Sequence, residues 1–156
     1  MRAKLYIAVS CMSLFCAGME VQAMEEAQVA ELTEEIGEEY GICPELLQAV
    51  AWQESRYDEN AESSGCVGLM QVSERWHKDR MKRLQVNDLS DPEGNIRVAA
   101  DYLAELFRQY EDVGMVLMVY SGNSAAEEYA AIGNGLSEYA EEILEHACSL
   151  ERQHGK

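Results

Sequence analysis

The chain has 156 residues and a formal net charge of −17 at pH 7, from 29 acidic and 12 basic side chains. This length suits one domain with a sizeable core, and a hydrophobic content of 47% is typical of globular proteins. The acidic surface repels the phosphate backbone of nucleic acids, so we expect no nucleic-acid partner. Binding to any other anionic polymer must come from a local groove.

Residues 1–23 have the pattern of a secretory signal peptide. The basic residues Arg2 and Lys4 precede a mostly apolar stretch that is short for a membrane span, and a small-residue cleavage pattern ends at Ala23. We therefore expect an exported mature domain, residues 24–156, on the extracellular, cell-wall or periplasmic side of the cytoplasmic membrane. The alternative is an uncleaved membrane anchor.

Two helices are predicted at the start of the mature domain. Apolar residues recur at helical spacing over residues 25–40, and Gly41 ends this helix. Pro44, a favoured first helical residue, begins the second helix, which runs to Ser55. The apolar face of the second helix carries an unexpected glutamate, Glu54.

Glu54 shares one helical face with Leu47, Val50 and Ala51. A carboxyl on an apolar face needs a partner or a raised pKa, and the C-terminal end of a helix also disfavours negative charge. Both effects favour the protonated form, which a general acid needs near neutral pH. The alternative is a glutamate that ends the apolar stripe and turns to solvent.

A loop region follows the Glu54 helix. Asparagine, serine and glycine residues over 57–68 predict a loop with a short hairpin. The stretch Gly68-Leu69-Met70-Gln71 comes next, and Ser73 is placed to cap a short helix over residues 74–83.

The remaining chain is predicted to be helical with short breaks. Asp91 and Pro92 form a strong helix start. A further turn of helix is expected over residues 127–131, between two glycine-containing breaks. The three longer helices cover residues 92–110, 113–120 and 137–150. The sequence therefore predicts one mainly α domain with a small loop or hairpin region after the Glu54 helix.

Three cysteines, Cys43, Cys66 and Cys148, lie in the mature part. Export would permit a disulfide, and a bond between Cys43 and Cys66 would close a loop that brackets Glu54. The alternative is three small buried side chains. No C-x-x-C pair or histidine cluster is present, so we expect neither a metal nor a cofactor.

Several short motifs occur together in a specific order and spacing. They are Gln53-Glu54-Ser55, Gly68-Leu69-Met70-Gln71, Asp91-Pro92 with Asn95-Ile96 and Tyr102-Leu103, and Val119-Tyr120. As a set they resemble the soluble lytic transglycosylase (SLT) catalytic domain, which is related in fold to goose-type lysozyme. The resemblance covers about residues 40–143 and implies a lysozyme-like single domain.

The resemblance implies a cleft that holds a peptidoglycan glycan strand. Glu54 matches the family's single catalytic acid/base, which protonates the bond between N-acetylmuramic acid and N-acetylglucosamine and then helps to close a 1,6-anhydro ring. Ordinary glycosidases use two carboxylates, and an internal nucleophile removes the need for the second. The family also suggests a local task, such as opening the wall for a secretion or conjugation apparatus.

The resemblance further implies substrate-binding roles for Ser55, Gly68, Met70, Gln71, Tyr120 and Tyr139. Alternatives from the residues alone are a helix-end serine at Ser55, core filling at Met70 and a core tyrosine at Tyr120. Asn95 is expected to be structural.

Tryptophans and the break after Tyr120 complete the expectations for the cleft. Trp52 is expected in the core, whereas Trp76 could stack on a sugar. Ser121 stands where the family has an asparagine, which Asn123 could replace from a shifted loop.

Two other functions remain open at this point. A muramidase of the same fold would need a positioned water and a second carboxylate. An inactive glycan-binding module would keep the cleft without turnover.

Overall fold

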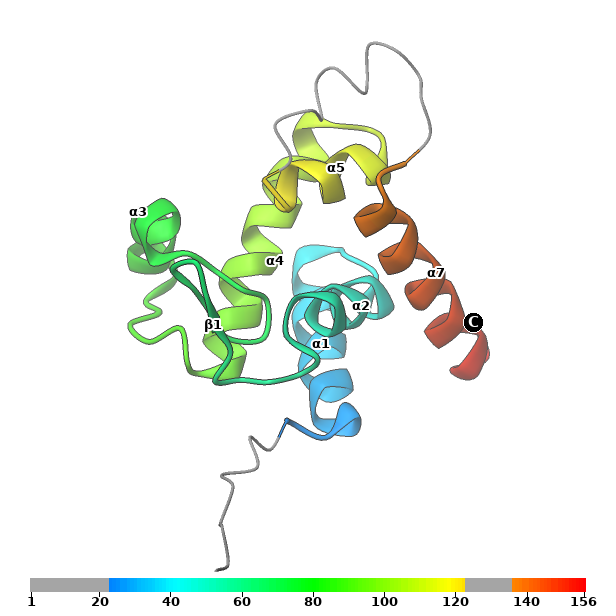
Figure 1. Ribbon diagram of the computed structural model, residues 1–156, viewed down its shortest axis with the longest axis horizontal. Coiled ribbons are helices and arrows are strands. Elements are labelled where there is room, and N and C mark those ends of the chain that lie inside the picture. The colour runs from blue at the N-terminus through cyan, green and yellow to red at the C-terminus, as the bar shows by residue number, and fades with distance from the viewer. Residues whose placement is uncertain (1–22, 123–135) are drawn as a thin grey trace, which may run out of the picture.

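The computed structural model describes residues 23–122 and 136–156. Within these ranges the chain forms six helices and one two-stranded hairpin, so the expected mainly α fold is confirmed (Figure 1). The elements are α1 (Glu26–Tyr40), α2 (Pro44–Ser55), β1 (Glu62–Ser63), β2 (Cys66–Val67), α3 (Glu74–Leu84), α4 (Pro92–Gln109), α5 (Val113–Tyr120) and α7 (Glu138–Gln153). The expected signal segment, the turn at residues 127–131 and Asn123 lie outside the described residues.

Helix α2 lies at the centre of the domain. It packs against α1 and α7, while α4 packs against α1, α3 and α5. In Figure 1, α2 runs between the hairpin and α3 on one side and α7 on the other. Leu47, Ala49, Val50 and Ala51 are each 0% exposed. Because α2 is covered on most sides, Glu54 near its C-terminal end is partly buried.

Most helix starts follow the expected chemistry. The Asp91 carboxylate accepts a hydrogen bond from Gly94 N at 2.8 Å and caps α4. Gly41 ends α1 in the left-handed conformation, with φ of 67°. Ser73 occupies the predicted N-cap position of α3, but its side chain makes no capping hydrogen bond.

Buried Asn95 ties the loop after the hairpin to α4. Its Oδ1 accepts a hydrogen bond from Met70 N at 2.8 Å, and its Nδ2 donates to the carbonyls of Val67 and Leu89, each at 2.8 Å. A Cβ at Gly68, whose φ is +78°, would lie 2.4 Å from this amide nitrogen. These contacts explain both the glycine and the structural role expected for Asn95.

The antiparallel pair α2 and α7 is held together at both ends. At the start of α2, the buried Glu45 carboxylate accepts hydrogen bonds from Lys156 Nζ at 2.8 Å and Cys43 Sγ at 3.2 Å. His154 Nδ1 lies 2.9 Å from the same carboxylate. At the other end of α2 is Glu54, opposite the first turn of α7.

The disulfide between Cys43 and Cys66, which the sequence left open, is absent, because all three described cysteines are free thiols. Cys43 precedes the first residue of α2, whereas Cys66 lies near Glu54 at the far end of this 12-residue helix. That helix is about 18 Å long, far beyond the reach of a disulfide. The alternative of three buried thiols is also wrong, since Cys43 and Cys148 are exposed.

Trp52 does not lie in the core as expected. Its side chain is 39% exposed and packs at the surface, with the Arg56 guanidinium 5.0 Å from its ring centroid. Within the described ranges, no helix is long and apolar enough to cross a membrane.

Candidate active site

A cleft of about 760 Å³ runs past the end of α2 and brings together residues from distant parts of the chain. Its walls are formed by the hairpin loop and α3 on one side, and by α4, α5 and the start of α7 on the other. The lining residues are Glu54, Ser63, Ser64, Cys66, Gln71, Val72, Ser73, Trp76, His77, Arg80, Ala99, Tyr102, Val119, Tyr120, Ser121, Gly122 and Tyr139.

Glu54 and Tyr139 meet in this cleft. The Tyr139 hydroxyl donates a hydrogen bond to Glu54 Oε1. Burial raises the pKa of Glu54, and the hydrogen bond from Tyr139 acts in the opposite direction. Burial and the nearby Glu54 charge raise the pKa of Tyr139, so its hydroxyl stays protonated and remains a donor. The result is a half-buried carboxyl with one fixed donor and access to the cleft.

Tyr120 lines the cleft, but its hydroxyl is used elsewhere. It donates to the backbone carbonyl of Met70 at 2.8 Å, and its ring lies 5.8 Å from that of Tyr102. The tyrosine hydrogen-bonded to Glu54 is therefore Tyr139 of α7, whereas the Tyr120 hydroxyl ties α5 to the loop after the hairpin. Burial and the nearby Glu54 charge raise the pKa of Tyr120.

The other expected binding residues divide between the cleft and the interior. Gln71 lines the cleft, and its amide donates to the carbonyls of Ala61 and Gly68, each at 3.0 Å, so it also holds the hairpin loop. Ser55, Gly68 and Met70 are not among the lining residues. The Ser55 hydroxyl donates to the Ala51 carbonyl at 3.1 Å, as a helix-end serine does.

Met70 fills the core, which was the alternative to a substrate-binding role for this residue. Its side chain is 0% exposed, and only its backbone serves the site, through Tyr120 and Asn95. Gly68 supports the cleft indirectly, by allowing Asn95 to approach the loop.

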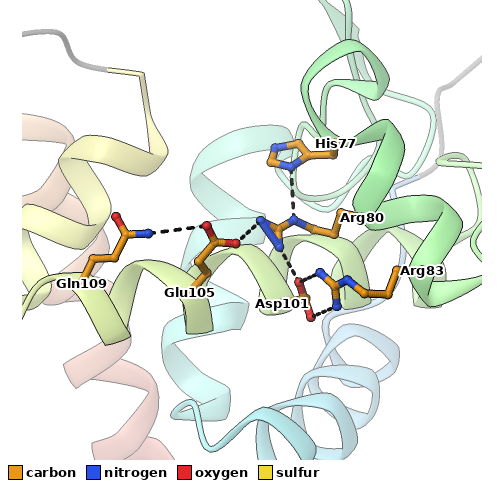
Figure 2. A network of polar contacts seen from close by, with 6 residues as sticks. All are labelled: His77, Arg80, Arg83, Asp101, Glu105 and Gln109. Atoms are coloured by element: carbon orange, nitrogen blue, oxygen red, sulfur yellow. Dashed lines mark hydrogen bonds and ion pairs between the residues drawn. The ribbon is translucent and has the colours of Figure 1, made fainter.

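The wall formed by α3 contains residues to which sequence reasoning gave no role. Arg80 donates to Asp101 and to Glu105 of α4, the latter at 2.6 Å, and its Nε donates to His77 Nδ1 at 3.4 Å (Figure 2). The Arg80 guanidinium also lies 5.1 Å from the centroid of the Tyr102 ring. The sequence contained one signal for this network, namely the helical spacing of Arg80 and Arg83 in α3 and of Asp101 and Glu105 in α4.

The cleft is almost free of net charge. Among the described residues that line it, Glu54 is the sole carboxylate and Arg80 the sole permanent cation. Arg80 is compensated by Asp101 and Glu105. The one described cluster of potential metal ligands, Cys43 with Glu45 and Glu151, lies at the opposite end of α2.

The chain is similar in sequence to several known proteins. The family model for the transglycosylase SLT domain matches residues 31–136. An X polypeptide from Escherichia coli is 35% identical over 94 residues, which are 55% of this chain and 55% of that protein. A membrane-bound lytic murein transglycosylase F from Mannheimia succiniciproducens is 38% identical over 68 residues, 43% of this chain and 13% of that protein. The chain thus spans about half the length of the first relative and a small part of the second.

A solved structure shares the fold. The X-ray structure of an inactive mutant of lytic transglycosylase Slt from Pseudomonas aeruginosa matches with a TM-score of 0.70 at 18% identity, over 80% of this chain and 24% of that one. This match confirms the lysozyme-like helical fold expected from the motifs. The family model covers more than half of the sequence and shows that the chain belongs to the transglycosylase SLT domain family.

Proposed function

We propose that this domain is a peptidoglycan lytic transglycosylase that cleaves the β-1,4 bond between N-acetylmuramic acid and N-acetylglucosamine. The observation that carries the proposal is Glu54, a half-buried carboxyl with a raised pKa in a cleft that has no second carboxylate among its described lining residues. A single acid/base suits a reaction in which the substrate supplies its own nucleophile, whereas ordinary glycosidases need two carboxylates.

In the proposed reaction, protonated Glu54 gives its proton to the glycosidic oxygen as the bond from that oxygen to the muramoyl anomeric carbon breaks. The bonding electrons leave with the oxygen of N-acetylglucosamine. Glu54, now a carboxylate, accepts the proton of the muramoyl 6-hydroxyl, whose oxygen attacks the anomeric carbon and closes the 1,6-anhydro ring. Tyr139 supports the carboxylate stage through its hydrogen bond. No water is consumed, and Glu54 ends protonated as it began.

Export follows from the same proposal, since peptidoglycan lies outside the cytoplasm. The pattern of residues 1–23 supports cleavage before a mature domain at 24–156. Sequencing the N-terminus of the secreted protein tests this, and a start at Met1 would support the retained anchor instead.

A local task, opening the wall for a secretion or conjugation apparatus, is proposed by analogy with the family. Deleting the gene should impair transfer through that apparatus. Wild type should restore transfer and Glu54→Gln should not, whereas equal rescue by both would contradict the idea.

The central test is a digest of purified peptidoglycan by residues 24–156, followed by mass spectrometry of the released muropeptides. Wild type should release anhydro-muropeptides. Glu54→Gln should keep its fold, as seen by circular dichroism, and lose about 10²- to 10⁴-fold in rate. Full activity in this variant would refute the acid/base role.

The same digest separates the other two functions. Products heavier by one water would identify a muramidase. A folded wild-type domain that binds glycan but releases nothing would identify a binding module.

A further inference from the structure

We propose that Trp76 and His77 of α3 form an outer sugar subsite, which binds an uncharged N-acetylhexosamine ring of the glycan strand away from the cleaved bond. The assignment rests on the proposed function, which supplies the ligand class. It goes beyond that function because it places glycan recognition on the α3 wall, apart from Glu54. Both residues line the same cleft as Glu54, so one continuous strand can reach both places.

Trp76 is placed to act as a stacking platform. Its side chain is 75% exposed, in the first turn of α3, although burial of an indole is strongly favourable. The guanidinium of Arg75 lies 5.1 Å from the ring centroid, over one face of the indole. The apolar C–H face of a pyranose ring fits an aromatic face, so a sugar in the cleft would cover surface that now meets water.

His77 supplies a directed hydrogen-bond donor next to this platform. Arg80 Nε is always protonated and donates to His77 Nδ1 at 3.4 Å, which leaves the proton of the neutral ring on Nε2. The ring is held 4.8 Å from that of Tyr102. In Figure 2 the second ring nitrogen points away from Arg80, and it has no hydrogen-bond partner among the described residues. It can therefore donate to a sugar hydroxyl or acetamido carbonyl.

The charge of Arg80, the one permanent cation among the described residues that line the cleft, is already compensated. Arg80 is bound by Asp101 and Glu105, and Asp101 also accepts two hydrogen bonds from Arg83. Hydrogen bonds from Arg83 and Arg80 outweigh burial and lower the pKa of Asp101 to about 2, so this compensation persists at neutral pH. A stem peptide would bring carboxylates to a cleft whose one lining cation among the described residues is already paired. The sugar ring is therefore the favoured occupant. The Arg75 guanidinium over Trp76 makes such a carboxylate the competing occupant, which the peptide-free ligand in the test distinguishes from the sugar.

The chain provides a matched control in Trp52. Like Trp76, Trp52 is partly exposed and has an arginine over its ring, with the Arg56 guanidinium 5.0 Å from the ring centroid. Unlike Trp76, it does not line the cleft. Replacing either tryptophan removes a surface indole and an arginine contact. Only Trp76→Ala removes an indole from the proposed subsite.

The test is calorimetric titration of the full-length Glu54→Gln chain with a β-1,4-linked N-acetylglucosamine tetramer, which carries no peptide. Adding Trp76→Ala should weaken binding by at least about tenfold, whereas adding Trp52→Ala should leave it unchanged. His77→Phe, which keeps the ring packing and loses the donor, should weaken binding about fivefold. The nitrogen shifts of His77 in NMR spectra should show the proton on Nε2.

Each outcome decides the matter. Equal affinity with and without Trp76, no binding of the tetramer at millimolar concentration, or binding only of glycans that carry peptide would overturn the subsite. If wild type released no anhydro product while tetramer binding still depended on Trp76, the proposed reaction would fail and the subsite would stand. If wild type released anhydro product normally but tetramer affinity did not depend on Trp76, the proposed reaction would stand and the subsite would fail.

Discussion

Glu54 is governed by two opposing influences within a few ångströms. Burial favours its neutral form, and the Tyr139 hydroxyl favours its carboxylate. The proposed reaction needs both forms in turn, first as acid and then as base. With burial alone, Glu54 would not give up its proton readily enough to act as the acid. With the Tyr139 hydrogen bond alone, it would already be ionised before the bond breaks.

Removing the Tyr139 hydroxyl should change the pH dependence of cleavage. Tyr139→Phe removes the group that lowers the pKa of Glu54, so the pKa rises further and the protonated acid persists to higher pH. The alkaline limb of kcat/KM should move upward in pH, and the maximal rate should fall about tenfold because the carboxylate stage loses its donor. The measurement is a pH profile of anhydro-muropeptide release.

Tyr120→Phe is the control for this prediction. Its hydroxyl donates to the Met70 carbonyl and not to Glu54. It should therefore cost about 1 kcal/mol of folding stability and leave the alkaline limb in place. A limb that moved equally in both variants would mean that Tyr139 has no special tie to Glu54.

From the sequence, a residue of the cleft is easiest to recognise where its type contradicts the local pattern. Glu54 stood out as a carboxyl on an apolar helical face, and the structure places it at the cleft. Met70 and Ser55 gave no such contradiction, because an apolar residue and a helix-end serine have ordinary structural uses. His77 gained no role because its orientation depends on Arg80 and Tyr102, which only the packing of α3 on α4 brings together.

At the scale of elements, the pairing of α2 with α7 positions Glu54 against Tyr139. The far end of the pair is held by Glu45, which is 1% exposed and contacts His154 and Lys156 near the end of α7. Burial alone would raise the pKa of Glu45, but hydrogen bonds from Lys156 and His154 outweigh it and bring the pKa to about 2. The interaction therefore stabilises the folded chain above the ordinary glutamate pKa, and is lost as pH falls from about 4.5 toward 2.

Removing both C-terminal partners of Glu45 should destabilise the domain. His154→Ala with Lys156→Ala leaves the buried Glu45 carboxylate with Cys43 Sγ as its remaining side-chain donor. The free energy of unfolding at pH 7 should fall, by less than the full cost for a buried pair because both partners are partly exposed. Urea unfolding measures it. Adding Glu45→Gln should recover most of the loss, and a double variant as stable as wild type would contradict the role of Glu45.

Helix positions were the part of the fold that the sequence predicted best. Pro44, Asp91 and Gly41 act through local backbone chemistry, and most helices begin and end within a residue or two of the expected places. The exception is α7, which runs to Gln153, three residues beyond its expected end, because its polar last residues were taken for a tail. The predicted core position of Trp52 was wrong and the disulfide was left open, because both depend on which ends and faces of α2 meet other elements. Local pattern does not carry that information.

For the whole molecule, self-repulsion is the dominant electrostatic effect, given a net charge of −17. Raising NaCl from about 20 mM to 500 mM shortens the Debye length to a few ångströms. Screening should therefore raise Tm, even though it weakens surface pairs such as Arg97 with Glu93. Differential scanning calorimetry tests this. KCl should act equally if screening is the cause, and a falling Tm would mean that ion pairs outweigh the net charge.

Cys66 on the cleft wall has a consequence for irreversible inhibitors. Burial and the Glu54 charge raise the pKa of its thiol, so simple alkylating reagents meet little thiolate there and find the exposed Cys148 easier to reach. A mild electrophile carried on a short N-acetylglucosamine chain would instead be held beside Cys66 at high effective concentration. Selective labelling at this position would then come from where the sugar docks and not from the reactivity of the sulfur.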